Sequence, residues 1–241
     1  MPRPPATDRL PDLVRTAGDV FLARGYRRTQ MSDVTQAMGL SSGAIYRWVE
    51  SKEALFDLVL RCEADPAEIS RPRRLPLATP APGSTLAFLA RLLAEESRLP
   101  VLRAALETRS PANLAAEVAA IAREVFRSTA RHQRGLRIVE RSALDWPELS
   151  ELWWGRARAA VIELLSSYVR RRCDAGLFRG LPDPDSAARV VTEVAAYFAM
   201  HRHYDPHPST MNEVTAESLA VTAIVRTFVC TEPLPIEESR S

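Results

Sequence analysis

The chain has 241 residues and is 46% hydrophobic, which is enough apolar material for a packed core and excludes a wholly disordered protein. Alanine, leucine, arginine and glutamate are abundant and glycine numbers only 9, so the composition favours an all-α protein. With a net charge of +2, no apolar run of about 18 residues and no apolar signal sequence in residues 1–12, we expect a cytoplasmic protein without a membrane span.

Two helices are predicted at the start of the chain. Apolar residues at helical spacing indicate a first helix over residues 8–24, and Gly25 follows it as a left-handed cap. A second, short helix is expected from Met31 to Met38. Both present one apolar stripe, so we expect them to pack on a shared core.

The next residues have the pattern of a helix-turn-helix. Gly39 supplies the positive φ of a tight turn, and Leu40 anchors that turn in the core. A third helix is predicted over residues 42–49, with Ser41 or Ser42 as its N-cap and Ile45 facing inward. A fourth helix begins after Ser51, which is a good N-cap residue.

The outward face of the third helix has residue types that suit DNA. Small residues at Ser42 and Gly43 let the helix N-terminus enter a major groove, and Arg47 reaches a guanine edge or a phosphate. Tyr46 and Lys52 are expected to contact phosphates on either side, which fixes register. Lys52 is the only lysine, since 31 of the 32 basic residues are arginine.

The run from Met31 to Phe56 closely resembles the N-terminal domain of TetR-family transcriptional regulators, over about a quarter of the chain. The residues that match the family pattern are Phe21, Gly25, Tyr26, Thr29, Asp33, Val34, Ala37, Gly39, Leu40, Ser41, Gly43, Ile45, Tyr46 and Ser51 to Phe56. Thr35 departs from the usual alanine, so its hydroxyl needs a partner such as a carbonyl one turn back. Trp48 also departs from the pattern.

The resemblance implies roles for individual residues. It makes Tyr46 and Lys52 the phosphate contacts, places Ser42, Gly43 and Arg47 on the recognition helix, and puts Thr29 and Gln30 at the backbone-contacting start of the second helix. Ser41 completes the expected DNA-binding set.

Beyond residue 64 the pattern changes. Five prolines and Gly83 in residues 65–83 predict an irregular segment. Long helices are then expected over residues 84–98, 101–108, 111–129, 131–144, 147–174, 185–203 and 212–230. We interpret Arg170–Arg172 as basic charge placed at a helix C-terminus.

The last two helices are apolar on more than one side, which indicates either central helices of a monomer or helices covered by a partner. We expect a homodimer formed as a four-helix bundle. The expected dimer residues are Val190, Val191, Val194, Phe198, Ala220, Ile224 and Phe228.

Few other residues indicate a ligand site. Trp153, Trp154 and Tyr168 are weak candidates for effector contacts, with a core or interface role as the alternative. His201 and His203 face different sides of a helix, so we expect no metal site. Cys62, Cys173 and Cys230 lie far apart and are expected to be free thiols.

Residues 1–51 are therefore expected to form a helix-turn-helix domain, and residues 52–241 a larger helical effector-binding and dimerisation domain that starts with a linking helix at 52–64. The resemblance implies a ligand-responsive repressor that binds a palindromic operator and responds to a small apolar or aromatic effector. A helical enzyme or small-molecule-binding protein is the alternative, although no catalytic, cofactor-binding or phosphate-loop motif is present. A nucleoid-type DNA binder would need more positive charge.

Overall fold

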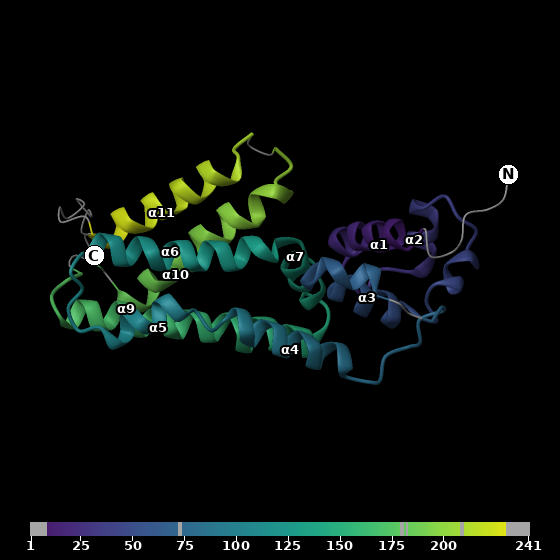
Figure 1. The fold of residues 1–241 in the computed structure, drawn as a ribbon, viewed down its shortest axis with the longest axis horizontal. Coiled ribbons are helices and arrows are strands. Elements are labelled where there is room, and N and C mark those ends of the chain that lie inside the picture. The colour runs from purple at the N-terminus through teal and green to yellow at the C-terminus, as the bar shows by residue number, and fades with distance from the viewer. Residues whose placement is uncertain (1–8, 72–73, 179–180, 182, 208–209, 230–241) are drawn as a thin grey trace, which may run out of the picture. The chain divides into compact units, whose positions relative to one another are not determined.

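The computed structural model describes residues 9–71, 74–178, 181, 183–207 and 210–229. These residues form helices and loops without a β-strand, and the β-pairing found among them is an isolated bridge between Val49 and Leu77. The predicted all-α fold is confirmed. Figure 1 shows the order of the helices along the chain.

The chain divides into two compact units. The first combines the residues up to Glu95 with His132–Arg158, and the second combines Glu96–Arg131 with the residues from Ala159 onward. The predicted functional boundary after residue 51 therefore falls inside the first unit. That boundary concerns function, and it stays a prediction.

The first unit joins the N-terminal helices to a segment from the middle of the chain. Its elements are α1 (Leu10–Arg24), α2 (Met31–Ala37), η2 (Ala44–Arg47), α3 (Lys52–Ala64), η3 (Pro66–Ser70), α4 (Ser84–Glu96), α7 (Gln133–Ala143), α8 (Pro147–Ser150) and η4 (Glu151–Arg158). The side chains of Phe21, Ile45, Leu55 and Ile138 are fully buried in one core. Each such side chain contributes about 1.5–3 kcal/mol by leaving water.

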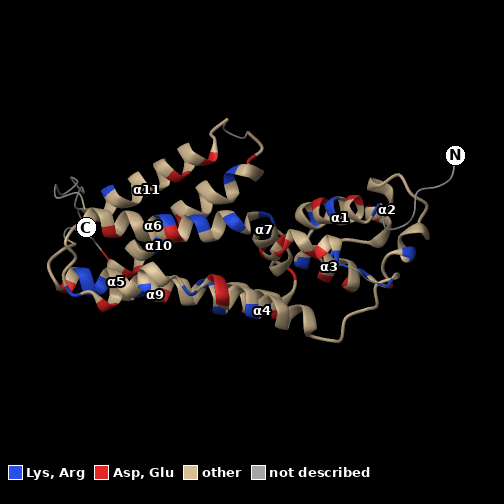
Figure 2. Cartoon of the chain, in the orientation of Figure 1, with Lys and Arg blue, Asp and Glu red and all other residues tan. Residues whose placement is uncertain are grey.

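The second unit is a helical bundle. Its elements are α5 (Pro100–Glu107), α6 (Leu114–Arg131), α9 (Ala159–Asp174), α10 (Pro184–Ala199), η5 (His201–Tyr204) and α11 (Glu213–Val229). Helix α6 packs against both α10 and α11, as Figure 1 shows. Basic and acidic residues are interspersed along α6 (Figure 2), so this helix carries charges of both signs.

The predicted helix over 147–174 is confirmed in position but not in geometry. Residues Glu151–Arg158 are π-helical, between the short α8 and the long α9. Residues 65–71 and 74–83 are largely irregular, as the prolines predict, apart from η3.

Arg172 lies in the last turn of α9, as the interpretation of Arg170–Arg172 expected, but its side chain is buried in the bundle. Its side chain is completely buried and pairs with Glu117 of α6 at 2.8 Å, and its guanidinium also donates to the backbone carbonyls of Ala105 and Thr108. It therefore satisfies the end of α5 from inside the bundle, whereas Arg170 and Arg171 are exposed.

Cys62 and Cys173 are half-buried and form no disulfide among the described residues, and Cys230 lies outside them. Within the described ranges no cluster of His, Cys, Asp or Glu has the arrangement of a metal site. In that same part of the chain, no helix combines the length and the apolarity needed to cross a membrane.

Candidate DNA-binding site

The turn after α2 has the predicted geometry. Gly39 adopts φ 64°, and the backbone N–H of Leu40 donates to the carbonyl of Thr35 at 2.8 Å. The hydroxyl of Thr35 donates to the carbonyl of Ser32 at 3.0 Å, which confirms the partner expected one turn back. The turn is thus closed by hydrogen bonds on both sides of the glycine.

The third helix is shorter than predicted. Instead of an α-helix over 42–49, the chain forms the 3₁₀ turn η2 from Ala44 to Arg47, and neither Ser41 nor Ser42 caps it with a side chain. Ile, Tyr and Trp are poor helix formers, and Leu77 pairs with the backbone on both sides of Val49, which draws the chain out of helical geometry.

One face of this turn is open to solvent. Ser41, Ser42, Gly43, Tyr46 and Arg47 are all exposed, and Tyr46 keeps 51% of its surface. A Cβ added to Gly43 would meet no atom within 4 Å, so none of the described residues covers this edge. The predicted DNA-facing residues therefore share one accessible surface.

The opposite face of η2 is the anchor. Ile45 and Trp48 are 0% and 1% exposed and pack in the core of the first unit. Trp48 is therefore a core residue, which removes it from the outward surface. The guanidinium of Arg47 lies 4.9 Å from the centre of the Trp48 ring, and its Nε donates to the carbonyl of Ala44 at 3.2 Å.

Lys52, the first residue of α3, is held by the carbonyls of Arg27 and Thr29 and by the Tyr26 ring, which together we call its seat. Its Nζ donates to the carbonyl of Thr29 at 3.0 Å and to that of Arg27 at 3.4 Å, and lies 4.5 Å from the centre of the Tyr26 ring. Ser51 caps α3 by accepting the N–H of Ala54 at 3.1 Å, as predicted. Because an ammonium has three donors, two carbonyls leave one N–H for a phosphate.

Tyr26 is the centre of this seat. Its hydroxyl donates to Glu53 at 2.8 Å, and burial together with that carboxylate raises the pKa of the tyrosine. A hydrogen bond from its own backbone N–H and the one from Tyr26 lower the pKa of Glu53. The tyrosine therefore stays neutral and the glutamate charged beside Lys52.

The two other predicted contacts at the start of α2 differ from each other. The side chain of Thr29 is 1% exposed, and its hydroxyl donates to the carbonyl of Gly25 at 2.7 Å, so it shapes the loop from inside. Gln30 is exposed and forms a capping box with Asp33. Only Gln30 of this pair presents its side chain to solvent.

Two of the local arginines are engaged by carboxylates. Arg24 pairs with Asp33 at 2.7 Å and Arg28 with Asp145 at 3.0 Å. Both arginines are more than half exposed, so these pairs are weak and leave the guanidinium groups accessible to solvent.

The segment from Arg134 to Trp146 contacts α1, α3 and the loop at Tyr26, an arrangement that no sequence pattern indicated. Arg134 bridges Asp19 of α1 at 2.9 Å and Glu63 of α3 at 2.7 Å. Ser142 accepts the N–H of Tyr26 at 3.1 Å, and the Trp146 ring stacks on Tyr26 with centres 4.7 Å apart. These partners are over 100 residues apart in sequence, except for Glu63.

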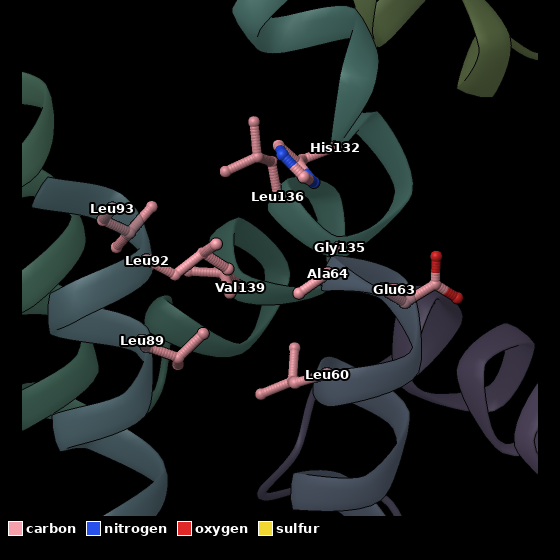
Figure 3. Close-up of a pocket in the computed structure, with 10 residues that line it drawn as sticks. All are labelled: Leu60, Glu63, Ala64, Leu89, Leu92, Leu93, His132, Gly135, Leu136 and Val139. Carbon is pink, nitrogen blue, oxygen red and sulfur yellow. The ribbon is translucent and has the colours of Figure 1, made fainter. Parts of the chain in front are cut away.

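The first unit also contains a small apolar cavity (Figure 3). Its lining comes from α3, α4, the start of α7 and His132, with residues Leu60, Glu63, Ala64, Leu89, Leu92, Leu93, His132, Gly135, Leu136 and Val139. The volume is about 20 Å³, which holds one water, whereas ligand pockets are roughly 300–1,000 Å³. The cavity as it stands is not an effector pocket.

None of the three candidate effector residues lines this cavity. Tyr168 is 3% exposed, and its hydroxyl donates to Glu117 at 2.9 Å; burial and this carboxylate raise its pKa. Trp154 is 36% exposed beneath Arg158, while Trp153 is half-buried with its indole nitrogen unpaired. The two tryptophans belong to the first unit and Tyr168 to the second, so neither unit by itself holds the predicted set.

The predicted dimer residues separate into two groups. Val191, Ala220, Ile224 and Phe228 are buried in the core of the second unit and offer no surface to a partner. Val190, Val194 and Phe198 are half-buried on α10. Tyr197 and Leu219 stay 47% and 45% exposed on α10 and α11.

Comparison with known proteins agrees with the geometry of the first unit. Residues 13–59 match the family model of bacterial regulatory proteins of the tetR family. Over 67 residues the chain is 37% identical to the HTH-type transcriptional repressor KstR2 of Rhodococcus jostii (strain RHA1), a match that covers 25% of this chain. It covers 33% of that repressor, so the chain spans about a third of its length.

Solved structures show the same fold over nearly the whole chain. The ketosteroid transcriptional regulator KstR2 of Mycobacterium tuberculosis aligns with a TM-score of 0.52 at 18% identity, covering 92% of this chain and 95% of that one. The TetR-family regulator PfmR of Thermus thermophilus aligns with a TM-score of 0.51 at 18% identity, covering 93% and 96%. The resemblance to TetR-family transcriptional regulators is thus confirmed over residues 13–59, and the all-helical fold is similar to that of solved regulators of this family.

Proposed function

We propose that this protein is a homodimeric, ligand-responsive repressor that binds a palindromic operator. Each subunit presents Ser42, Gly43, Tyr46 and Arg47 to a major groove, and Lys52 contacts a phosphate beside it. The name of the related Rhodococcus protein, a transcriptional repressor, supports the direction of control.

The observation that carries this proposal is the two-sided construction of η2. Its outer face is exposed and small at Ser42 and Gly43, with Arg47 beside them, while its inner face is fixed by the buried Ile45. Small residues allow close approach to DNA, and arginine is the side chain that most often reads guanine. The buried inner face of η2 fixes the position of both on the protein surface.

Control by a small molecule follows from preferential binding. We propose a small apolar or aromatic effector that binds best when the two DNA-reading surfaces are wrongly spaced for the operator. A hundredfold preference for that state corresponds to about 2.7 kcal/mol, which shifts an equilibrium of about 10:1 in favour of the DNA-binding spacing to about 1:10.

Selection of bound duplexes from a random pool with the purified protein tests DNA recognition. We expect a recovered site with two inverted half-sites about one helical turn apart. Recovery of no preferred sequence, with binding only at low salt, would instead favour a helical small-molecule-binding protein or enzyme.

Variants of the exposed face separate base reading from phosphate contact. Tyr46→Ala should weaken binding to all duplexes alike and leave the salt slope nearly unchanged, because a tyrosine hydroxyl contacts a phosphate without neutralising its charge. Arg47→Ala should also broaden the selected sequence by reducing discrimination at one position by about 1–3 kcal/mol.

The matched control is Arg91→Ala, which removes an exposed arginine from α4 of the same unit. Its affinity and sequence preference, measured by fluorescence anisotropy, should match those of the wild type. Equal losses in Arg47→Ala and Arg91→Ala would reduce the role of Arg47 to general charge.

A further inference from the structure

We propose that Trp146 is a positioning residue for DNA binding, which acts through Tyr26 to hold the Lys52 ammonium in place. Trp146 lies far from the helix-turn-helix in sequence and outside the predicted DNA-binding domain of residues 1–51. This proposal rests on the proposed function for its effect on DNA, although the seat of Lys52 can be tested without DNA.

The seat is formed by the loop between α1 and α2. Two carbonyls of this loop, on Arg27 and Thr29, accept hydrogen bonds from Nζ of Lys52, and the Tyr26 ring lies 4.5 Å from the same nitrogen. A lysine side chain has many rotamers, so an unheld Lys52 loses conformational entropy when it meets a phosphate. A Lys52 side chain that is already held has lost this conformational entropy before it meets the phosphate, so binding costs less.

The loop is itself held by the corner between α7 and α8. The Trp146 ring stacks on Tyr26 at 4.7 Å with an interplanar angle of 30°. Ser142 accepts the Tyr26 backbone N–H at 3.1 Å, and a Cβ added to Gly25 would lie 3.1 Å from the backbone oxygen of Arg141, a tight contact that places this part of the corner against the loop. Trp146 is therefore one of the contacts that fix the ring below Lys52.

Trp146 also belongs to a continuous aromatic cluster. Its ring centre is 6.0 Å from that of Phe56, which is 4.7 Å from Tyr26 and 5.0 Å from Phe21. Phe56 lies on α3, the helix that Lys52 begins. Trp146 thus contacts both the Tyr26 ring, which lies against the Lys52 ammonium, and α3, the helix that carries Lys52.

The single lysine makes the seat directly observable. Protein labelled with ¹³C-lysine has one lysine side-chain spectrum, and the Tyr26 ring should shift the ε-proton signal of Lys52 upfield from that of an unstructured lysine. In Trp146→Leu this signal should move toward the unstructured position, and in Trp146→Phe, which keeps a ring, it should stay close to the wild type.

The amide spectrum shows whether each variant is folded, and Trp154→Ala is the matched control because it removes a more exposed tryptophan from the same unit. An unchanged Lys52 signal in a folded Trp146→Leu protein overturns the proposal. If Trp146→Leu does not fold, Trp146→Met, which also lacks an aromatic ring, takes its place, and an unchanged Lys52 signal in that folded protein overturns the proposal.

The second part of the test is a double-mutant cycle that measures affinity for a selected operator. Lys52→Ala and Trp146→Leu should each weaken binding about threefold to tenfold and reduce the salt slope by up to about 1.8, since one phosphate contact is affected in each subunit of the dimer. Because both act on the same contact, Trp146→Leu should weaken the Lys52→Ala protein less than twofold.

Multiplicative losses with an unchanged salt slope for Trp146→Leu would show a general structural effect and contradict the positioning role. Absence of any selected operator for the wild type would contradict the proposed function instead, and the Lys52 signal would still test the seat. The two failures are therefore distinguishable.

Discussion

Arg172 is a charged residue buried in the core of the second unit, where an unpaired charge strongly destabilises the fold. Its side chain is fully buried, and the carboxylate of Glu117, only 12% exposed, pairs with it at 2.8 Å. Two backbone carbonyls take further donors of the guanidinium. Removing one partner of such a pair leaves an uncompensated buried charge, whereas an exposed pair contributes little.

We therefore expect Glu117→Gln to lower the free energy of unfolding by about 3–5 kcal/mol in urea denaturation. The control is Glu163→Gln, which breaks the exposed pair with Arg170 and should cost less than about 1 kcal/mol. Similar values for the two variants would show that the buried pair adds no special stability to the second unit.

The turn between α2 and η2 contains two glycines with opposite requirements. Gly39 has φ 64°, so a side chain there is strained, whereas Gly43 has φ −81° and open space around it. Gly39→Ala should destabilise the protein by about 1–2 kcal/mol. Gly43→Ala should stabilise it by about 0.4–1 kcal/mol, because alanine restricts the unfolded chain, yet weaken operator binding by crowding the groove.

Thermal unfolding and anisotropy measure the two effects separately. An increase in stability for Gly43→Ala together with unchanged operator affinity would mean that this edge of η2 does not approach DNA closely. The glycine pair thus tests the position of η2 on the operator, not only its fold.

The assembly depends on which faces of α10 and α11 remain accessible. Val194 is half-buried and lies near the exposed Tyr197, while Ile224 is 1% exposed in the subunit core. Val194→Asp should yield folded monomers with poor operator binding, because both half-sites must be held together. Ile224→Asp should instead unfold the second unit by burying a charge.

Light scattering and circular dichroism distinguish these outcomes. Val101→Asp is the control, since Val101 is 41% exposed on α5 of the same unit. A Val194→Asp protein that stays dimeric would move the interface away from this face of α10.

Local patterns predicted what is local. The glycine turn, the Ser51 cap and the bond from Thr35 to the carbonyl of Ser32 follow from residue types at short spacing, and each is present. The length of η2 was overestimated because the pairing of Val49 with Leu77 joins residues that no helical pattern connects. Propensity sets a weak preference, and this tertiary contact overrides it.

Long-range contacts left no sign in the sequence. The burial of Arg172 depends on Glu117, on a different helix, and the stacking of Trp146 on Tyr26 joins segments that periodicity treats independently. The same holds for α11: apolarity on several sides predicted a covered helix, but the pattern does not say which side the subunit itself covers. Ile224 and Phe228 belong to that inner side.

The bridge formed by Arg134 has a consequence for exchanging DNA-binding heads between regulators. One guanidinium joins Asp19, the carbonyl of Arg15 and Glu63, and Gly18 provides the space for it, since an added Cβ would lie 2.5 Å from its Nη2. A chimera cut after residue 64 transplants α1 and α3 without the side chain that fastens them together. The part that must be transferred is discontinuous in sequence. A functional chimera has to include α7 and the corner at Trp146 together with the helix-turn-helix.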